Sequence, residues 1–222
     1  MIEAVVFDLD GVLVDSEPVW EEVRRAVVTE HGGTWPPGAQ GRLMGMSTPE
    51  WARYLAVDLG VPLAPEDVAD LVIERMAARY GGGVPLLPGA VAAVDRLGGR
   101  WPLAVASSSP RRLIATALDS AGLAGAFSAV ASSEEARRGK PAPDVYVLAA
   151  ERLGRPAARC VAVEDSTNGL RAAEAAGMGV VALPRPAYPP DPATLARAGV
   201  VLASLDDLTG DVVAALGAPR CS

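Results

Sequence analysis

Two pairs of acidic residues each follow an apolar run, and carboxylates in such positions could bind a metal ion or react with a phosphate. Asp8 and Asp10 follow the apolar run at 4–7, and Glu164 and Asp165 follow the apolar run at 160–163. Adjacent acids buried at a strand end repel one another unless a cation or a proton compensates. A divalent metal ion would provide that compensation, although two solvated acids in a turn would explain either pair alone. Asp8 and Asp10 also resemble the start of a calcium loop, but the terminal glutamate of such a loop is missing.

Lys140 is the only lysine in the chain, and the other 19 basic residues are arginines. It lies in Gly139-Lys140-Pro141-Ala142-Pro143, where two prolines stiffen the loop and fix the direction of the side chain. Lysine provides a compact point charge and arginine a planar fork, so the two differ most where geometry matters. A single lysine in an arginine-rich chain could also arise from codon bias.

Three serines follow the apolar run at 103–106 and precede Pro110. A serine N-cap with proline at the first helical position predicts a helix that starts at Pro110. Its backbone N–H groups would lie at the strand end, ready for an anion. A helix cap needs no function, so this signal is weak alone. Together with the acids and the lysine, it completes the groups that phosphoryl transfer needs.

The elements that would hold these residues alternate between strands and helices. Valine-rich apolar runs predict buried parallel strands, and helical patterns lie between them. The sequence therefore predicts an α/β fold with a Rossmann-like parallel sheet, whose ligands bind beyond the carboxyl ends of the strands. The strands are expected at 4–7, 103–106, 160–163, 180–183 and 200–202, and the helices at 110–120, 144–153 and 169–176.

Residues 16–85 predict a small helical domain inserted after the first strand. Helical patterns cover 17–30, 49–59 and 65–80, with no convincing strand between them. Glycines at 81–83 then break the chain. We expect 16–85 to form a cap that closes over the site, and 1–15 with 86–222 to form the catalytic core.

Composition excludes several classes of protein. The net charge of −7 disfavours nucleic-acid binding, and no run approaches the 18 apolar residues of a membrane span. Cys160 and Cys221 form no disulfide framework. The first residues predict a strand and not a signal peptide, so we expect a cytoplasmic protein, and a monomer.

The motifs resemble those of phosphatases of the haloacid dehalogenase (HAD) superfamily. Residues 7–17 resemble the first motif, Ser107 the second, Lys140 in Gly-Lys-Pro the third, and Glu164-Asp165 the fourth. The helical insert resembles the cap of the β-phosphoglucomutase and sugar-phosphate phosphatase group. The resemblance implies Mg²⁺-dependent hydrolysis of a small phosphorylated metabolite such as a sugar or polyol phosphate.

The resemblance also implies a role for each matching residue. Asp8 would attack phosphorus and become an aspartyl phosphate, while Asp10 would act as general acid and then base. Ser107 and Lys140 would contact the phosphoryl group, with Ser108 beside them. Mg²⁺ would be held by an Asp8 oxygen, the Asp10 backbone carbonyl and Asp165, assisted by Glu164 and supported by Ser166.

Several positions distinguish this chain from particular members of the superfamily. Dehalogenases lack an acid at the position of Asp10, and phosphonoacetaldehyde hydrolase needs a cap lysine that this chain does not have. β-Phosphoglucomutase carries a histidine and an arginine where this chain has Trp20 and Thr48, which favours a phosphatase over a mutase. Trp20 would either bind the carbon skeleton of the substrate or pack within the cap with Val23 and Val27. A non-catalytic protein on the same fold is the third alternative.

Overall fold

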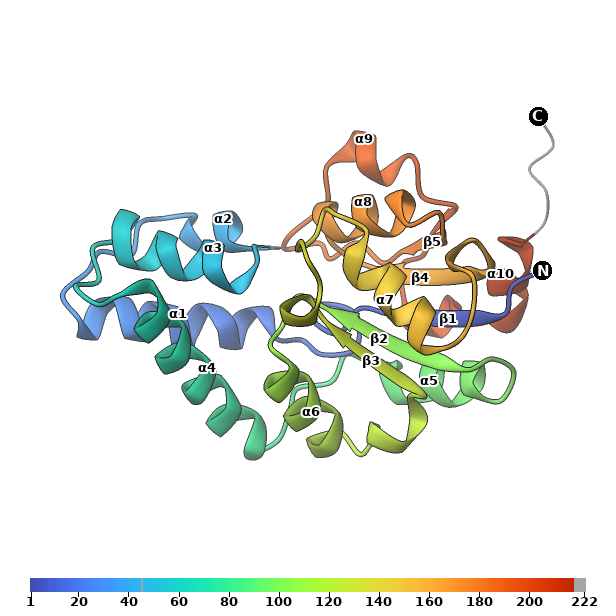
Figure 1. The fold of residues 1–222 in the computed structure, drawn as a ribbon, viewed down its shortest axis with the longest axis horizontal. Coiled ribbons are helices and arrows are strands. Elements are labelled where there is room, and N and C mark those ends of the chain that lie inside the picture. Colours follow the sequence, from blue (N-terminus) through green and yellow to red (C-terminus); the bar gives the residue numbers. More distant parts are fainter. Residues whose placement is uncertain (45, 218–222) are drawn as a thin grey trace.

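The computed structural model describes residues 1–44 and 46–217, and its centre is one parallel sheet of six strands (Figure 1). The strand order is β3-β2-β1-β4-β5-β6, so the first strand lies in the middle and the chain builds outward on both sides. The predicted α/β, Rossmann-like class is confirmed. The strands are β1 (Ala4–Phe7), β2 (Leu103–Ser107), β3 (Ala129–Ser132), β4 (Cys160–Glu164), β5 (Gly179–Ala182) and β6 (Val200–Val201).

Within residues 1–44 and 46–217, ten α-helices surround the sheet or form the inserted segment. None of the described helices is long and apolar enough to cross a membrane. The helices are α1 (Glu17–Glu30), α2 (Ala39–Leu43), α3 (Thr48–Arg53), α4 (Pro65–Gly81), α5 (Ala90–Gly98), α6 (Arg111–Ser120), α7 (Asp144–Arg152), α8 (Thr167–Ala175), α9 (Pro192–Leu195) and α10 (Gly210–Ala215).

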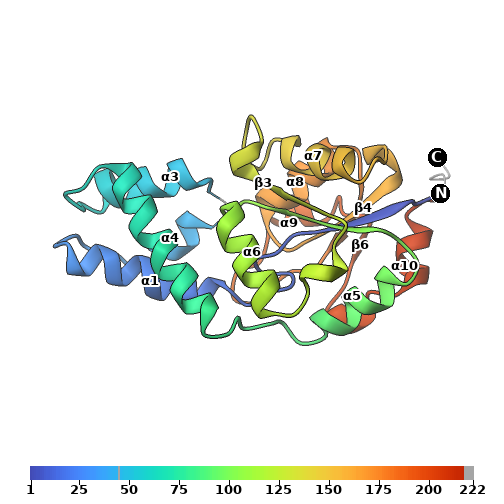
Figure 2. The same cartoon turned by 60° about the horizontal axis from the view of Figure 1, so that its bottom comes forward.

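The two faces of the sheet carry side chains of different size. Large residues such as Val5, Phe7 and Leu103 face α5, α6 and α10. The opposite face is mostly alanine, including Ala104, Ala106 and Ala162, and packs against α7 and α8. Figure 2 shows these two helical layers on either side of the strands. The alternation of large and small residues along each strand follows from the twofold side-chain period of a strand.

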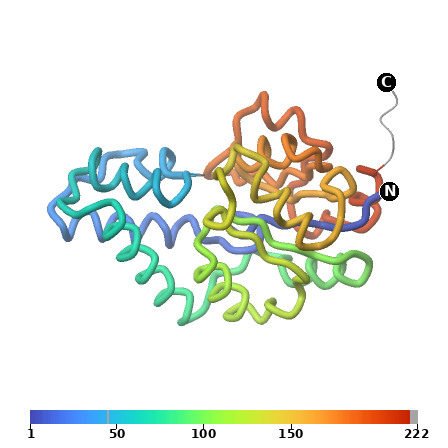
Figure 3. The backbone as a smooth tube through the Cα atoms, viewed as in Figure 1, coloured from blue at the N-terminus to red at the C-terminus, as the bar shows by residue number. Residues whose placement is uncertain are grey.

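The segment from α1 to α4 forms a helical lobe at one end of the molecule, and α4 extends back beside α6 (Figures 1 and 2). Its apolar residues belong to the same buried cluster as the large-residue face of the sheet. The two chain passages that join the lobe to the sheet lie side by side (Figure 3). Asp15 N donates to Pro85 O over 2.7 Å, and Leu87 N donates to Leu13 O over 2.9 Å. The lobe is therefore attached through a paired stem.

The predicted ends of several elements differ from those observed. The predicted serine cap is wrong: α6 begins at Arg111, and Pro110 is the extended N-cap residue, with φ −54° and ψ 141°. The Ser109 hydroxyl is bonded to Asp10 instead of capping the helix. Strand β3 had no predicted counterpart, because its short Ala-Val-Ala-Ser sequence carries little β-propensity. The helix predicted at 49–59 is also not continuous, since Tyr54–Asp58 forms a π-helical turn.

Candidate active site

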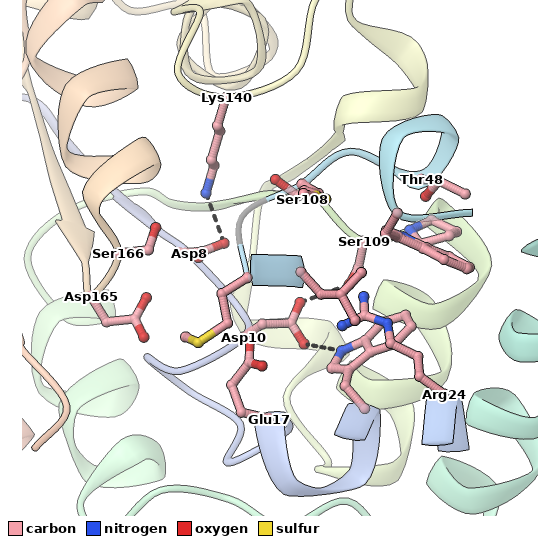
Figure 4. A pocket seen from close by; sticks show the side chains of 16 residues that line it. Asp8, Asp10, Glu17, Arg24, Thr48, Ser108, Ser109, Lys140, Asp165 and Ser166 are labelled. Carbon is pink, nitrogen blue, oxygen red and sulfur yellow. Dashed lines mark hydrogen bonds and ion pairs between the residues drawn. The ribbon is translucent and has the colours of Figure 1, made fainter. Parts of the chain in front are cut away.

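The carboxyl ends of β1, β2 and β4 converge on one pocket, which the helical lobe covers (Figure 4). This is the edge where strand order reverses around β1, and ligands of such sheets bind there. After Asp10 the chain turns at Gly11, whose φ of +81° is one that glycine adopts without strain. A Cβ on Gly11 would lie 2.0 Å from Oδ2 of Asp165. Glycine therefore permits the first strand end to approach the acidic pair of the fourth.

Three buried carboxylates meet at the floor of this pocket. Asp8, Glu164 and Asp165 each offer an oxygen within 4.8 Å of the others. Burial raises the pKa of Asp8 well above its usual value, and the nearby Glu164 and Asp10 add to the effect against the lowering influence of Lys140. Burial likewise raises the pKa of Asp165, with further contributions from Glu164 and Asp8. These carboxylates are costly to ionise together without an additional cation.

Glu164 is the most strongly bonded of the three acids. Its Oε1 lies 2.6 Å from Lys140 Nζ and accepts a hydrogen bond from the Tyr146 hydroxyl at 3.0 Å. Its Oε2 accepts hydrogen bonds from the backbone N–H groups of Asp165 and Ser166 and from the Ser166 hydroxyl. Burial alone would raise the pKa of Glu164, but Lys140 and these hydrogen bonds hold it below its usual value. Glu164 is therefore an ionised anchor for the lysine.

The remaining two acids fit a divalent cation. Oδ1 of Asp8 is buried and accepts no hydrogen bond within the described part of the chain, although Lys140 Nζ lies 3.0 Å away as an ion pair. The Asp165 carboxylate also accepts no side-chain or backbone hydrogen bond from residues 1–44 and 46–217. Three carboxylates face one lysine, and hard oxygen donors of this kind are the ligands that Mg²⁺ prefers.

Asp10 receives three hydrogen bonds in the same pocket. Its Oδ2 accepts from the hydroxyls of Ser107 at 3.2 Å and Ser109 at 2.7 Å. Its Oδ1 accepts from Nε1 of Trp20 at 3.3 Å, so a residue of the helical lobe contacts a residue of the sheet. The Asp10 carboxylate is thereby directed toward Ser109 and Trp20 (Figure 4).

All the residues predicted for the site lie in or beside this pocket. Ser107 is fully buried and bonded to Asp10, whereas Ser108 lines the pocket. Trp20 also lines the pocket, and the Arg24 guanidinium lies over its ring at 4.3 Å from the centroid. Both interpretations of Trp20, as a substrate contact and as packing within the lobe, therefore stay predictions.

Sequence reasoning missed three residues of the site. Tyr146 anchors Glu164, Ser109 bonds Asp10, and Arg24 lines the pocket from α1. Ser109 could have been found, because it follows Ser107 at the same strand end. Tyr146 and Arg24 lie in helices whose side-chain directions no motif fixes.

The chain belongs to the haloacid dehalogenase-like hydrolase family, whose profile matches residues 2–177. It is a phosphatase of this family. Hexitol phosphatase B of Escherichia coli K12 is 35% identical over 214 residues, which cover 94% of this chain and 95% of that protein. The phosphorylated carbohydrates phosphatase of Thermotoga maritima is 32% identical over 178 residues, covering 80% and 82% of the two chains.

Solved structures share the arrangement of the whole chain. CbbY from Rhodobacter sphaeroides, solved in complex with phosphate, superposes with a TM-score of 0.86 at 28% identity, covering 96% of this chain and 100% of the other. β-Phosphoglucomutase from Clostridium difficile has a TM-score of 0.84 at 20% identity, covering 98% and 97%, and shows a common fold.

Proposed function

We propose that this protein hydrolyses a sugar or polyol monophosphate in a Mg²⁺-dependent reaction, with Asp8 as the nucleophile. The observation that carries the proposal is the position of Asp8, whose buried carboxylate lies between Lys140 and the acid Asp165 at the floor of the pocket. A carboxylate with one cation beside it and a second cation site in reach can approach a phosphate dianion without prohibitive repulsion.

The proposed reaction has two displacement steps. In the first, an Asp8 oxygen forms a bond to phosphorus while the bond to the ester oxygen breaks, and Asp10 gives that oxygen a proton. In the second, Asp10 takes a proton from a water molecule whose oxygen attacks phosphorus. Inorganic phosphate leaves, and the Asp8 carboxylate is restored. The three hydrogen bonds to Asp10 orient its carboxylate for both proton transfers.

Asp8, Asp165 and the Asp10 backbone carbonyl would hold the Mg²⁺ ion, which supplies positive charge beside the transferring phosphoryl group. We propose Glu164 as the residue that positions Lys140 rather than as a direct ligand, because its oxygens already accept five contacts. Ser108 and Lys140 would contact the phosphoryl oxygens, with Ser107 supporting Asp10.

We further propose that residues 16–85 act as a cap over a core made of 1–15 and 86–222. Trp20 supports this role, since it is the cap residue that donates to Asp10. The named relatives that are sugar and hexitol phosphatases support a carbohydrate or alditol ester as substrate. A phosphomutase is the alternative, but Thr48 provides no cationic clamp for the second phosphate of a bisphosphate intermediate.

Phosphate release from a panel of phosphorylated sugars and alditols tests the proposal. Release should require Mg²⁺ and be lost in Asp8→Asn, while Asp58→Asn, on the far turn of the lobe, serves as a control that keeps activity. Chromatography of the products separates the two functions, because a mutase would yield an isomeric sugar phosphate and no free phosphate. Full activity in Asp8→Asn would refute the assignment of the nucleophile.

A further inference from the structure

An arginine of α1 lines the active-site pocket from the lobe, and its Nε has no hydrogen-bond partner in the described part of the chain. Arg24 is 5% exposed and lines the pocket together with Asp10, Glu17 and Thr48 (Figure 4). Its Nε is buried and donates no hydrogen bond within residues 1–44 and 46–217. Glu17 and Asp10 are the acidic groups nearest to its charge. Buried charges are usually paired or hydrogen-bonded, so an arginine in this state is open to a ligand.

Two tryptophans hold the guanidinium in place. Its central carbon lies 4.3 Å from the ring centroid of Trp20 and 5.1 Å from that of Trp51. Cation–π contacts of this kind compensate part of the desolvation of the charge. Burial lowers the pKa of Arg24 to about 10, so the guanidinium is still protonated at neutral pH. The planar fork is therefore charged, oriented and only partly satisfied by the protein.

Arg24 lies on the side of the pocket where the alcohol of the ester would be bound. Trp20, which carries the guanidinium on its ring, donates to Asp10 through Nε1. Asp10 is the residue proposed to protonate the ester oxygen, so the alcohol attached to that oxygen lies on the Arg24 side of the pocket. Asp165 and Lys140 lie on the other side of Asp8 in the close-up view (Figure 4).

The other polar groups on the Arg24 side of the pocket, which we call the lobe wall, indicate what kind of alcohol would fit. Oγ1 of Thr48 is buried without a hydrogen bond to any described residue. Glu17 lines the same pocket as an acceptor, held by a 2.6 Å hydrogen bond from Gln40 Nε2. The lobe wall therefore combines one cationic donor, one acidic acceptor and one hydroxyl, with no excess of positive charge. Hydroxyl groups both donate and accept, so they match such a wall better than a second anion does.

We propose that Arg24 and Thr48 form a subsite that binds hydroxyl groups of the leaving alcohol, so that the enzyme selects polyhydroxylated esters over plain alkyl phosphates. This inference rests on the proposed function, since it names the substrate feature that the same pocket recognises. Arg24 acts here as a specificity residue, and its guanidinium donates to a substrate oxygen.

Paired substrates test the subsite. kcat/KM is measured with sorbitol 6-phosphate and with n-hexyl phosphate, which has the same chain length but no hydroxyls. In Arg24→Met, which keeps an unbranched side chain over the tryptophans, the ratio of the two kcat/KM values should fall about 10- to 100-fold, because a hydrogen bond to a charged group is lost. Thr48→Val should reduce the ratio in the same direction. Arg79→Met, in an exposed pair with Glu22 of the lobe, is the control and should leave both values unchanged.

Equal losses with both esters, or no loss with either, would overturn the inference and leave Arg24 a packing residue. A larger loss in Arg24→Met with fructose 1,6-bisphosphate than with fructose 6-phosphate would also overturn it, since the subsite would then bind an anion.

A binding measurement separates the inference from the proposed function. Calorimetric titration of Asp8→Asn with the two esters, with and without Arg24→Met, requires no turnover. If the wild-type enzyme released phosphate from no ester, the proposed function would fail. Weaker binding of the sorbitol ester alone would still support the subsite, and an unchanged preference would refute it.

Discussion

Lys140 Nζ lies 2.6 Å from Oε1 of Glu164, closer than the 3.0 Å that separates it from Oδ1 of Asp8. The only lysine of the chain is thus anchored by one acid and directed at another. Removal of one partner from a buried ion pair leaves an uncompensated charge, which typically costs about 3–5 kcal/mol of stability.

Glu164→Gln should therefore impair both folding and catalysis. We expect a loss of about 3 kcal/mol in the free energy of unfolding, and a kcat at least about 100-fold lower because Lys140 is no longer held toward Asp8. Urea unfolding and steady-state kinetics check the two effects. Glu3→Gln breaks the exposed pair with Arg159 and is the matched control, with little change in either quantity. A Glu164→Gln enzyme with unaltered stability would show that the ion pair between Glu164 and Lys140 does not stabilise the fold.

Asp165→Asn should stabilise the metal-free protein. The pKa of Asp165 is raised in the folded state by burial and by its acidic neighbours. The stability associated with its protonated form is fully present below the unfolded pKa of about 3.9 and is lost as the pH rises through the folded pKa. In EDTA, the free energy of unfolding of Asp165→Asn should exceed that of the wild type, by a margin that grows as the pH rises above the unfolded-state pKa of about 3.9.

Mg²⁺ should reverse the order of the two proteins. Ligand binding to the folded state stabilises the wild type, whereas Asp165→Asn lacks a proposed ligand and should gain less. Denaturant titrations with and without Mg²⁺ measure both differences. If Asp165→Asn were less stable than the wild type in EDTA at pH 8, the ionised Asp165 carboxylate would not destabilise the metal-free protein.

Trp20→Phe should remove the bond between the helical lobe and Asp10 while it leaves an aromatic ring in place. We expect kcat to fall about 10- to 100-fold, since a hydrogen bond to a charged group contributes on the order of 1.5–3 kcal/mol. Trp101→Phe loses a similar Nε1 bond, to the Ile2 carbonyl, and should leave kcat unchanged. Steady-state kinetics measure both variants. Equal kcat values for the wild type and Trp20→Phe would rule out this contact as a means of orienting Asp10.

Gly169→Ala should be destabilising, although alanine ordinarily favours a helix over glycine by up to about 1 kcal/mol. A Cβ at this position would lie 1.6 Å from Oε1 of Glu164. The carboxylate would have to move, and the lysine with it, so both stability and activity should drop. Gly98→Ala, at the exposed end of α5, meets only an ordinary contact at 3.5 Å from Leu103 and is the control. Thermal unfolding of the two variants should give shifts of Tm in opposite directions.

Local sequence predicted the parts of the site that lie at strand ends. Asp8, Asp10, Glu164 and Asp165 follow uninterrupted apolar runs, and a parallel sheet brings such ends together. The sequence could not predict which acid binds Lys140 and which acids are left for a cation, because this depends on the hydrogen-bond donors around each carboxylate oxygen. Glu164 is bonded to Tyr146, a helical residue that no motif marks.

The contribution of the lobe was the least predictable part. Trp20 and Arg24 lie on one helix, and their spacing predicts only a shared buried face. That this face lies against Asp10 depends on how the lobe is placed on the sheet. The edge strand β3, which pairs with β2, likewise lacks a strong local signal.

The alanine-lined face of the sheet sets a limit on how this enzyme can change. Small side chains let α7 and α8 approach the strands closely. Helix α7 carries Tyr146, and the two residues just before α8 donate the backbone hydrogen bonds that hold Glu164. An added methyl group at Ala162 would push a helix outward, since packed interiors have little free volume. Such a shift would displace Tyr146 and Glu164, and with them Lys140, which is proposed to bind the phosphoryl group. We therefore expect preferences for new esters to arise through substitutions in the helical lobe, which packs with the large-residue face of the sheet. Side chains there can be exchanged without displacing Glu164 and Lys140.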